Sequence, residues 1–159
     1  MKSLTWFVLA AAVLFAAPAF AQESANMTME ILKEKVKADK KLLVAANMNL
    51  TDAEAKGFWP MYESYQKELG QLNQRTVAVI KNYADAHNAG QGMIPNETAK
   101  KLLKEALATD EAEVKLRQSY AAKLEKVLPS TKVARYLQIE NKIRAILKFE
   151  LAQQIPLVQ

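Results

Sequence analysis

The sequence contains no cysteine, and it has one histidine, His87, among its 159 residues. The absence of cysteine excludes a disulfide scaffold, a thiol catalyst, a zinc finger and a lipid anchor attached through sulfur, because each needs at least one thiol. A single imidazole also excludes metal sites that are built from several histidines. Glycine and proline are scarce, at 4 and 5 residues. We therefore expect few loops and long regular elements.

The first 21 residues have the layout of a secretory signal peptide. Lys2 gives a positive start, residues 4–20 are almost wholly apolar, and Ala19-Phe20-Ala21 forms a small-x-small cleavage signal. We expect cleavage after this signal, leaving a mature chain of residues 22–159 with a loose tail at residues 22–28. An uncleaved anchor is the alternative, but the apolar run is at the lower limit for a membrane span. No later run approaches that length, so we expect no transmembrane segment after cleavage.

Beyond this segment the sequence has the periodicity of helices, and no long run alternates as a strand does. We predict an all-α fold of four helices, two of them long, at approximately residues 29–46, 51–87, 94–127 and 131–153. The long helices span about 45–50 Å each at 1.5 Å per residue, too long for one compact bundle to bury their apolar stripes. An elongated helical hairpin, and a homodimer that covers the remaining apolar residues, fit this pattern best.

No constellation of catalytic residues is recognisable in the sequence. His87 lies beside the one glycine-rich stretch and is interpreted as an ordinary helix-end residue rather than a metal contact. Carboxylates mostly alternate with lysines, as in Glu111 and Lys115, and this i,i+4 spacing is typical of solvated helix faces. The Glu-x-x-His pattern of di-iron bundles is absent. We therefore expect neither an enzyme nor a metal or cofactor site.

The densest aromatic run is Phe58-Trp59-Pro60-Met61-Tyr62. Apolar side chains occupy every side of a helical turn here, so a single core cannot cover all of them. Two interpretations remain open. The run is either a buried turn, or a surface on which Trp59, Met61 and Tyr62 contact other polypeptides through large side chains with polar ends.

The formal net charge is +5, and the excess of positive charge lies in the last predicted helix. An exported chain without a dense basic block is a poor candidate for binding nucleic acid, so we expect no nucleic-acid partner. A positive helix face of this kind is typical of a solvated surface, and the alternative is a surface that attracts acidic polypeptides or an anionic membrane. We therefore place Arg135 and Lys142 of this helix beside the aromatic residues as candidate contacts for a polypeptide partner.

A short motif, Leu50-Thr51-Asp52-Ala53-Glu54, precedes the second predicted helix. Thr51 is the expected N-cap, and Glu54 three residues later completes a capping box. With Leu50, these residues resemble the Leu-Thr-x-x-Gln motif of the Spy/CpxP family, with Glu54 in place of glutamine. The exported, cysteine-free, helical layout is also similar to that family. A second such motif is expected before the fourth helix, but Val127-Leu128-Pro129-Ser130-Thr131 stands there instead, so that motif is degenerate or lost.

The resemblance implies a periplasmic, ATP-independent chaperone. Members of the family are thin antiparallel dimers that bind unfolded or envelope polypeptides on a concave surface of apolar and basic character. In that interpretation Trp59, Met61, Tyr62, Arg135 and Lys142 contact the client. The alternative is a periplasmic adaptor or stress-sensor regulator that binds one specific envelope partner.

Overall fold

The computed structural model describes residues 38–158, which belong to two compact units with their boundary between Leu43 and Val44. The predicted signal peptide, the loose tail and the first part of the first predicted helix lie outside the described residues. Residues 38–43 are helical, and the second unit begins with helical residues 44–48. The described residues form helices and connections without a strand, which confirms the all-α prediction. None of these helices is long and apolar enough to cross a membrane.

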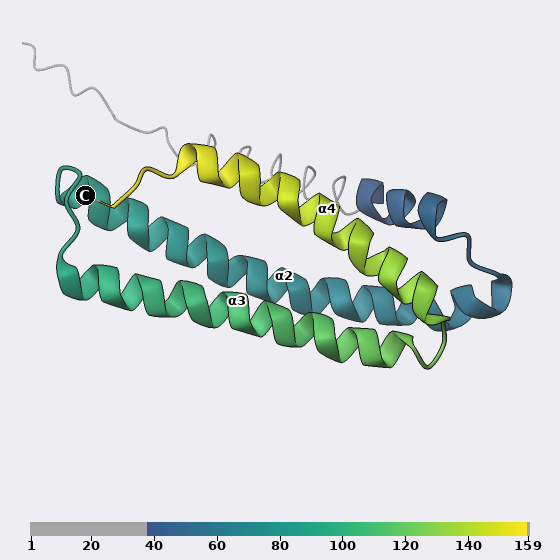
Figure 1. Cartoon of the computed structure of the whole chain (residues 1–159). Coiled ribbons are helices and arrows are strands. Elements are labelled where there is room, and N and C mark those ends of the chain that lie inside the picture. The colour runs from purple at the N-terminus through teal and green to yellow at the C-terminus, as the bar shows by residue number, and fades with distance from the viewer. Residues whose placement is uncertain (1–37, 159) are drawn as a thin grey trace, which may run out of the picture. The chain divides into compact units, whose positions relative to one another are not determined.

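Three helices make up the rest of the second unit: α2 at Asp52–Ala89, α3 at Asn96–Leu124 and α4 at Ser130–Gln154. The predicted bounds of these helices are therefore correct to within a few residues. Helices α2 and α3 lie side by side and run in opposite directions, and α4 starts beside the end of α3 and runs back along them (Figure 1). Along their described lengths, no Cα atom of α4 comes within 8 Å of one of α2.

The start of α2 is fixed by the predicted capping box. The backbone N–H of Thr51 donates to Glu54 Oε2 at 2.8 Å, and the backbone N–H of Glu54 donates to Thr51 Oγ1 at 3.3 Å. Glu54 also accepts a hydrogen bond from Lys132 Nζ at 2.6 Å. This bond from α4, followed by the bond from the Thr51 backbone, lowers the pKa of the Glu54 carboxyl group. The motif therefore caps α2 and also fastens the first turn of α4 to it.

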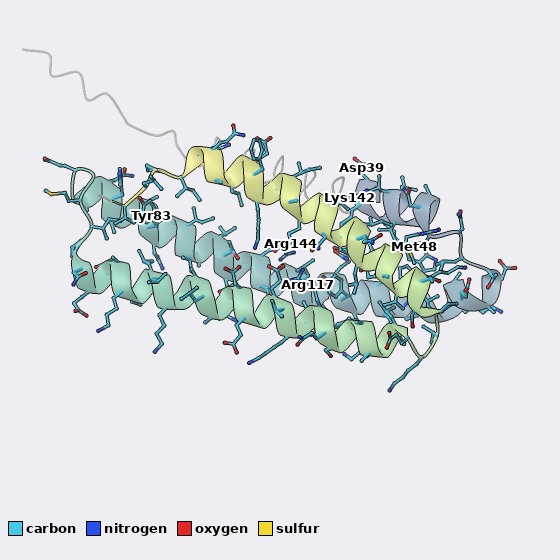
Figure 2. The ribbon with its side chains drawn as sticks, viewed as in Figure 1. Asp39, Met48, Tyr83, Arg117, Lys142 and Arg144 are labelled. Atoms are coloured by element: carbon cyan, nitrogen blue, oxygen red, sulfur yellow. The ribbon has the colours of Figure 1, made fainter. Side chains whose placement is uncertain are left out.

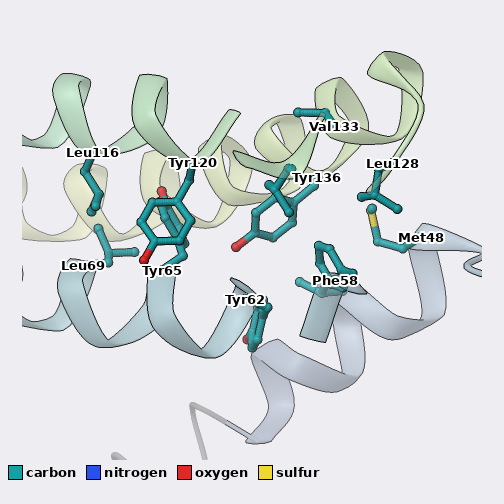
Figure 3. Packing of buried hydrophobic residues seen from close by; sticks show 12 residues of the cluster. Met48, Phe58, Tyr62, Tyr65, Leu69, Leu116, Tyr120, Leu128, Val133 and Tyr136 are labelled. Carbon is teal, nitrogen blue, oxygen red and sulfur yellow. The ribbon is translucent and has the colours of Figure 1, made fainter. Parts of the chain in front are cut away.

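The core is built around five aromatic residues, which we call the aromatic cluster: Phe58, Tyr62, Tyr65, Tyr120 and Tyr136. Their rings meet mostly edge to face (Figure 3), and the ring centroids of Phe58 and Tyr136 and those of Tyr65 and Tyr120 are both 5.2 Å apart. This geometry is favourable because the positive ring edge meets the negative ring face. Since α2, α3 and α4 each contribute rings, the aromatic cluster joins all three helices.

A glycine allows the close approach of α2 to the connection between α3 and α4. A Cβ atom built at Gly57 would lie 2.9 Å from Cβ of Val127, closer than side chains tolerate. Glycine therefore costs some helix propensity at this position but permits tight packing. Leu124 and Leu128, on either side of Val127, are buried in the same core.

The core does not extend along the whole length of the helices. Phe58, Tyr62, Tyr65 and Leu69 recur at spacings of four and three residues along α2, and all four are buried. The same spacing continues at Leu72, Thr76, Val79 and Tyr83, which are only half-buried. In α4 the last buried residue is Glu140. Tight packing is therefore concentrated at the end of the unit where α2 and α4 begin.

Replacing Tyr62 by serine tests the assignment of this residue to the core. Tyr62 is 3% exposed and packs against Phe58, Trp59 and Tyr136. We expect Tyr62→Ser to lower the free energy of unfolding by about 3–5 kcal/mol, the usual cost of removing a buried aromatic ring. Urea denaturation followed by far-ultraviolet circular dichroism measures this loss. Lys67→Ala, at an exposed position of the same helix, is the control, and an equal effect of both changes would contradict the assignment.

Candidate binding site

The second half of α4 is exposed on all sides. Every residue from 145 to 154 is exposed, although four of them are large and apolar. Leu147 and Leu151 continue the helix row of Tyr136 and Glu140 that faces α2 and α3, yet they are 54% and 42% exposed. Ile146 and Phe149 point to the other sides of the helix and are also exposed. Large apolar side chains of this kind are typical of surfaces that contact a partner.

A groove of about 320 Å³ lies between this half of α4 and the two other helices. We call it the α4 groove. Residues from all three helices line it: Thr76, Val79, Ile80, Ala106, Thr109, Asp110, Lys148, Leu151, Ala152 and Ile155. The hydroxyl groups of Thr76 and Thr109 donate to backbone oxygens of their own helices, at 3.3 and 2.9 Å. The walls therefore present mainly apolar groups to a ligand.

A hydrogen bond from α2 holds the chain just beyond α4 near the groove. The Tyr83 hydroxyl group donates to the backbone oxygen of Pro156 at 2.7 Å, and Tyr83 is labelled near the end of α2 in Figure 2. Ile155, the residue before Pro156, lines the groove. The end of α4 is therefore tied to α2 while the helix itself leaves the groove open.

A group of charged residues lies between α3 and α4 next to the groove. We call Asp110, Glu113, Arg117, Arg144 and Lys148 the charged cluster. Glu113 is buried and forms an ion pair with Arg144, and Lys148 Nζ lies 3.8 Å from Glu113 Oε2 and 3.3 Å from Asp110 Oδ1. Arg117 and Arg144 lie between the two helices (Figure 2). The charged cluster therefore holds α4 to α3 by ion pairs where apolar packing has ended.

A polar contact between α2 and α4 separates the charged cluster from the aromatic cluster. Gln66 Nε2 donates to Glu140 Oε1 at 2.8 Å and to the Tyr136 hydroxyl oxygen at 3.2 Å. Glu140 is buried, and its negative charge acts on the neighbouring tyrosines. Burial, followed by this charge, raises the pKa of Tyr65 to about 12.

The structure separates the five residues that the sequence put forward as polypeptide contacts. Tyr62 is buried in the aromatic cluster, and Trp59 and Met61 are half-buried against the core. For Tyr62, the buried turn is therefore the interpretation of the aromatic run that the structure supports. Arg135 and Lys142 are exposed on α4.

Lys142 belongs to a second hollow, of about 430 Å³, beside the charged cluster. It lines this hollow together with Arg117, Asn141, Arg144 and Lys148 among others. Arg117 Nη1 donates to Asn141 Oδ1 at 2.9 Å, which adds another link between α3 and α4. The hollow is therefore rich in positive charge, as the sequence predicted for the last helix.

Metal ligands do not gather in the part of the chain that the structure describes. Residues 38–158 contain no group of three or more histidine, aspartate or glutamate side chains placed to hold an ion. His87 is half-buried near the end of α2, with its ring centroid 5.8 Å from that of Tyr83.

The α4 groove was not predicted from the sequence. Helical periodicity places Leu147 on an apolar edge of the last helix, and such an edge normally predicts burial. One signal was available, since Ile146, Leu147, Phe149 and Leu151 surround the helix, and a single core covers one side of a helix.

Comparisons with protein-family models, with curated proteins and with solved structures found no match to this chain. The resemblance to the Spy/CpxP family stays a prediction from the sequence.

The ion pair of Glu113 and Arg144 should stabilise the protein only while both partners are present. Glu113→Ala leaves Arg144, whose side chain is 18% exposed, without its main counter-charge. We expect this change to lower the free energy of unfolding by about 3 kcal/mol, and the double change Glu113→Leu with Arg144→Met to recover most of the loss. Denaturant unfolding measures both effects.

Glu111→Ala is the control for this pair, since Glu111 forms an exposed ion pair with Lys115 one turn apart in the same helix. Exposed pairs contribute little, so we expect nearly unchanged stability. An equally small effect of Glu113→Ala would contradict the proposed role of the charged cluster.

The buried tyrosines should make the fold sensitive to alkaline pH. The pKa of Tyr65 is about 12 in the folded chain, against about 10 for an unfolded tyrosine. Between these values the folded state holds a proton that the unfolded state has lost, so stability falls as pH rises above about 10. We expect the urea midpoint of Tyr65→Phe to fall less steeply than that of the wild type between pH 9 and 11. Parallel curves for the two proteins would contradict this assignment.

Proposed function

We propose that this protein is a periplasmic, ATP-independent chaperone-like protein that binds unfolded or envelope polypeptides in the α4 groove. The observation that carries the proposal is the groove itself, with apolar walls and with Leu151 exposed at its edge. The predicted signal peptide and the resemblance to the Spy/CpxP family support the compartment and the class of activity.

The size of the groove suits apolar side chains of a polypeptide. Its volume of about 320 Å³ is at the lower end of the range for small-molecule sites, about 300–1,000 Å³. Leu147 and Leu151 offer apolar contact that needs no fixed geometry, because the hydrophobic effect is not directional. Binding of this kind accepts many sequences, as a chaperone requires.

Positive charge on α4 favours capture of acidic segments. Lys142 and Arg135 are exposed on this helix, and Lys142 lines the second hollow. Such charge accelerates association with an oppositely charged chain more than it strengthens the complex. The basic residues therefore support the initial encounter, and the apolar groove supports retention.

We also propose that the chain forms a homodimer, because one copy leaves large apolar residues of α4 exposed on more than one side. The groove is on the side of α4 that faces α2 and α3. Its use by a client is therefore compatible with a second copy on another side of the helix.

Suppression of aggregation tests the proposed activity. We expect the purified full chain to protect a chemically denatured model protein at near-stoichiometric ratios without ATP. Replacing Leu147 and Leu151 together by serine should raise the amount needed for half-protection several-fold, since burying each leucine side chain contributes about 1.5–3 kcal/mol. Both residues are exposed, so far-ultraviolet circular dichroism should show unchanged helicity.

Met93→Ser is the matched control for this test. Met93 is 67% exposed in the connection between α2 and α3 and is not among the residues that line the groove, so its replacement should leave protection unchanged. Absence of protection by the folded wild type would contradict the chaperone proposal. Saturable binding of one envelope protein in pull-downs would then favour the adaptor or regulator.

A further inference from the structure

The outer side of α4 carries a row of exposed residues with a symmetric order. The row consists of Gln138, Lys142, Ile146, Glu150 and Gln154, with four residues from each member to the next. Residues at this spacing form a continuous ridge on a helix surface. The five residues span about 24 Å at 1.5 Å per residue. We call this row the α4 ridge.

The α4 ridge is complementary to itself when it is reversed. Ile146 is at its centre, and Lys142 and Glu150 lie at equal distances on either side, about 6 Å along the axis. Gln138 and Gln154 occupy the two outer positions. Reversing the row therefore places each positive charge opposite a negative one, and each glutamine opposite a glutamine.

We infer that a second copy of this chain docks on the α4 ridge, with the two α4 helices antiparallel around a two-fold axis at Ile146. Lys142 of each copy then faces Glu150 of the other, and the two Ile146 side chains meet at the centre. An interface between identical surfaces of this kind is the commonest in soluble oligomers.

The charges available on α4 agree with this arrangement. No ion pair joins Lys142 or Glu150 to another residue in the described part of the chain, so both charges are available. A parallel pair would place Lys142 against Lys142, which is unfavourable. A negatively charged membrane surface would repel Glu150 beside the exposed Ile146, so the ridge suits a second copy better.

Further apolar contact comes from the residues beside the ridge. In the antiparallel arrangement Phe149 of one copy lies opposite Ile143 of the other, three residues on either side of the axis. Phe149 is 63% exposed and Ile143 is half-buried in the single chain. The inference rests on the proposed homodimer, and it leaves the α4 groove on the other side of the helix free for a client.

Charge reversal tests the pairing without any client present. Sedimentation of the full chain over a range of concentrations should show a dimer, and Lys142→Glu or Glu150→Lys alone should raise its dissociation constant by about tenfold, because two attractive pairs become repulsive. The combined change restores the pairs in reversed order, so the dissociation constant should return to within about threefold of the wild type. Lys67→Glu, at an exposed position of α2, is the control and should have no effect.

The absence of cysteine allows a direct test of the axis. In Ile146→Cys the new thiol is the chain's only one, and across a two-fold axis it meets its own copy, so mild oxidation should give a disulfide-linked dimer. Lys67→Cys should stay largely uncross-linked. A monomer at all concentrations, or a dimer that neither Lys142→Glu nor Glu150→Lys weakens, would overturn the inference. Because mass is the readout, loss of the dimer is distinguishable from loss of client protection.

Discussion

The aromatic cluster is the interaction on which the rest of this structure depends. Phe58, Tyr62 and Tyr65 of α2 meet Tyr120 of α3 and Tyr136 of α4 through ring contacts in which edges face ring surfaces. Large rings bury much apolar area with few rotatable bonds, so a small number of them can hold three helices together. Because all five rings lie at one end of the unit, the helices are fixed there.

Because the aromatic cluster holds the helices at one end only, the other end of α4 is packed differently. Beyond Glu140 the helix has no buried residue, and the charged cluster around Glu113 and Arg144 takes over the contact with α3. Ion pairs hold helices together without filling the space between them. The α4 groove follows from this change from apolar to ionic contact, whereas the α4 ridge lies on the outer side of the helix. The inner side is then suited to a client and the outer side to a second copy.

Much of this fold was predictable because helix signals are local. The capping box of Thr51 and Glu54 marks the start of α2, and the spacing from Phe58 to Leu69 identifies its buried side. The ion pair of Glu54 with Lys132 was not predictable, since it joins residues far apart in the sequence. In the sequence, Gly57 indicates only a weaker helix, because its close approach to Val127 depends on how two elements pack. Neither the burial of Tyr62 nor the exposure of Leu151 was predictable, because periodicity shows which residues share a side of a helix but not where the core ends.

Hydrogen exchange of the full chain, with and without a denatured client, tests the central claim most directly. The account predicts the slowest exchange in the helical turns around Tyr65 and Tyr120. It also predicts that a client slows exchange in residues 76–80 and 148–155, two segments that contribute residues to the lining of the α4 groove. Client-dependent protection confined to the turn around Trp59, with no change in those two segments, would contradict it.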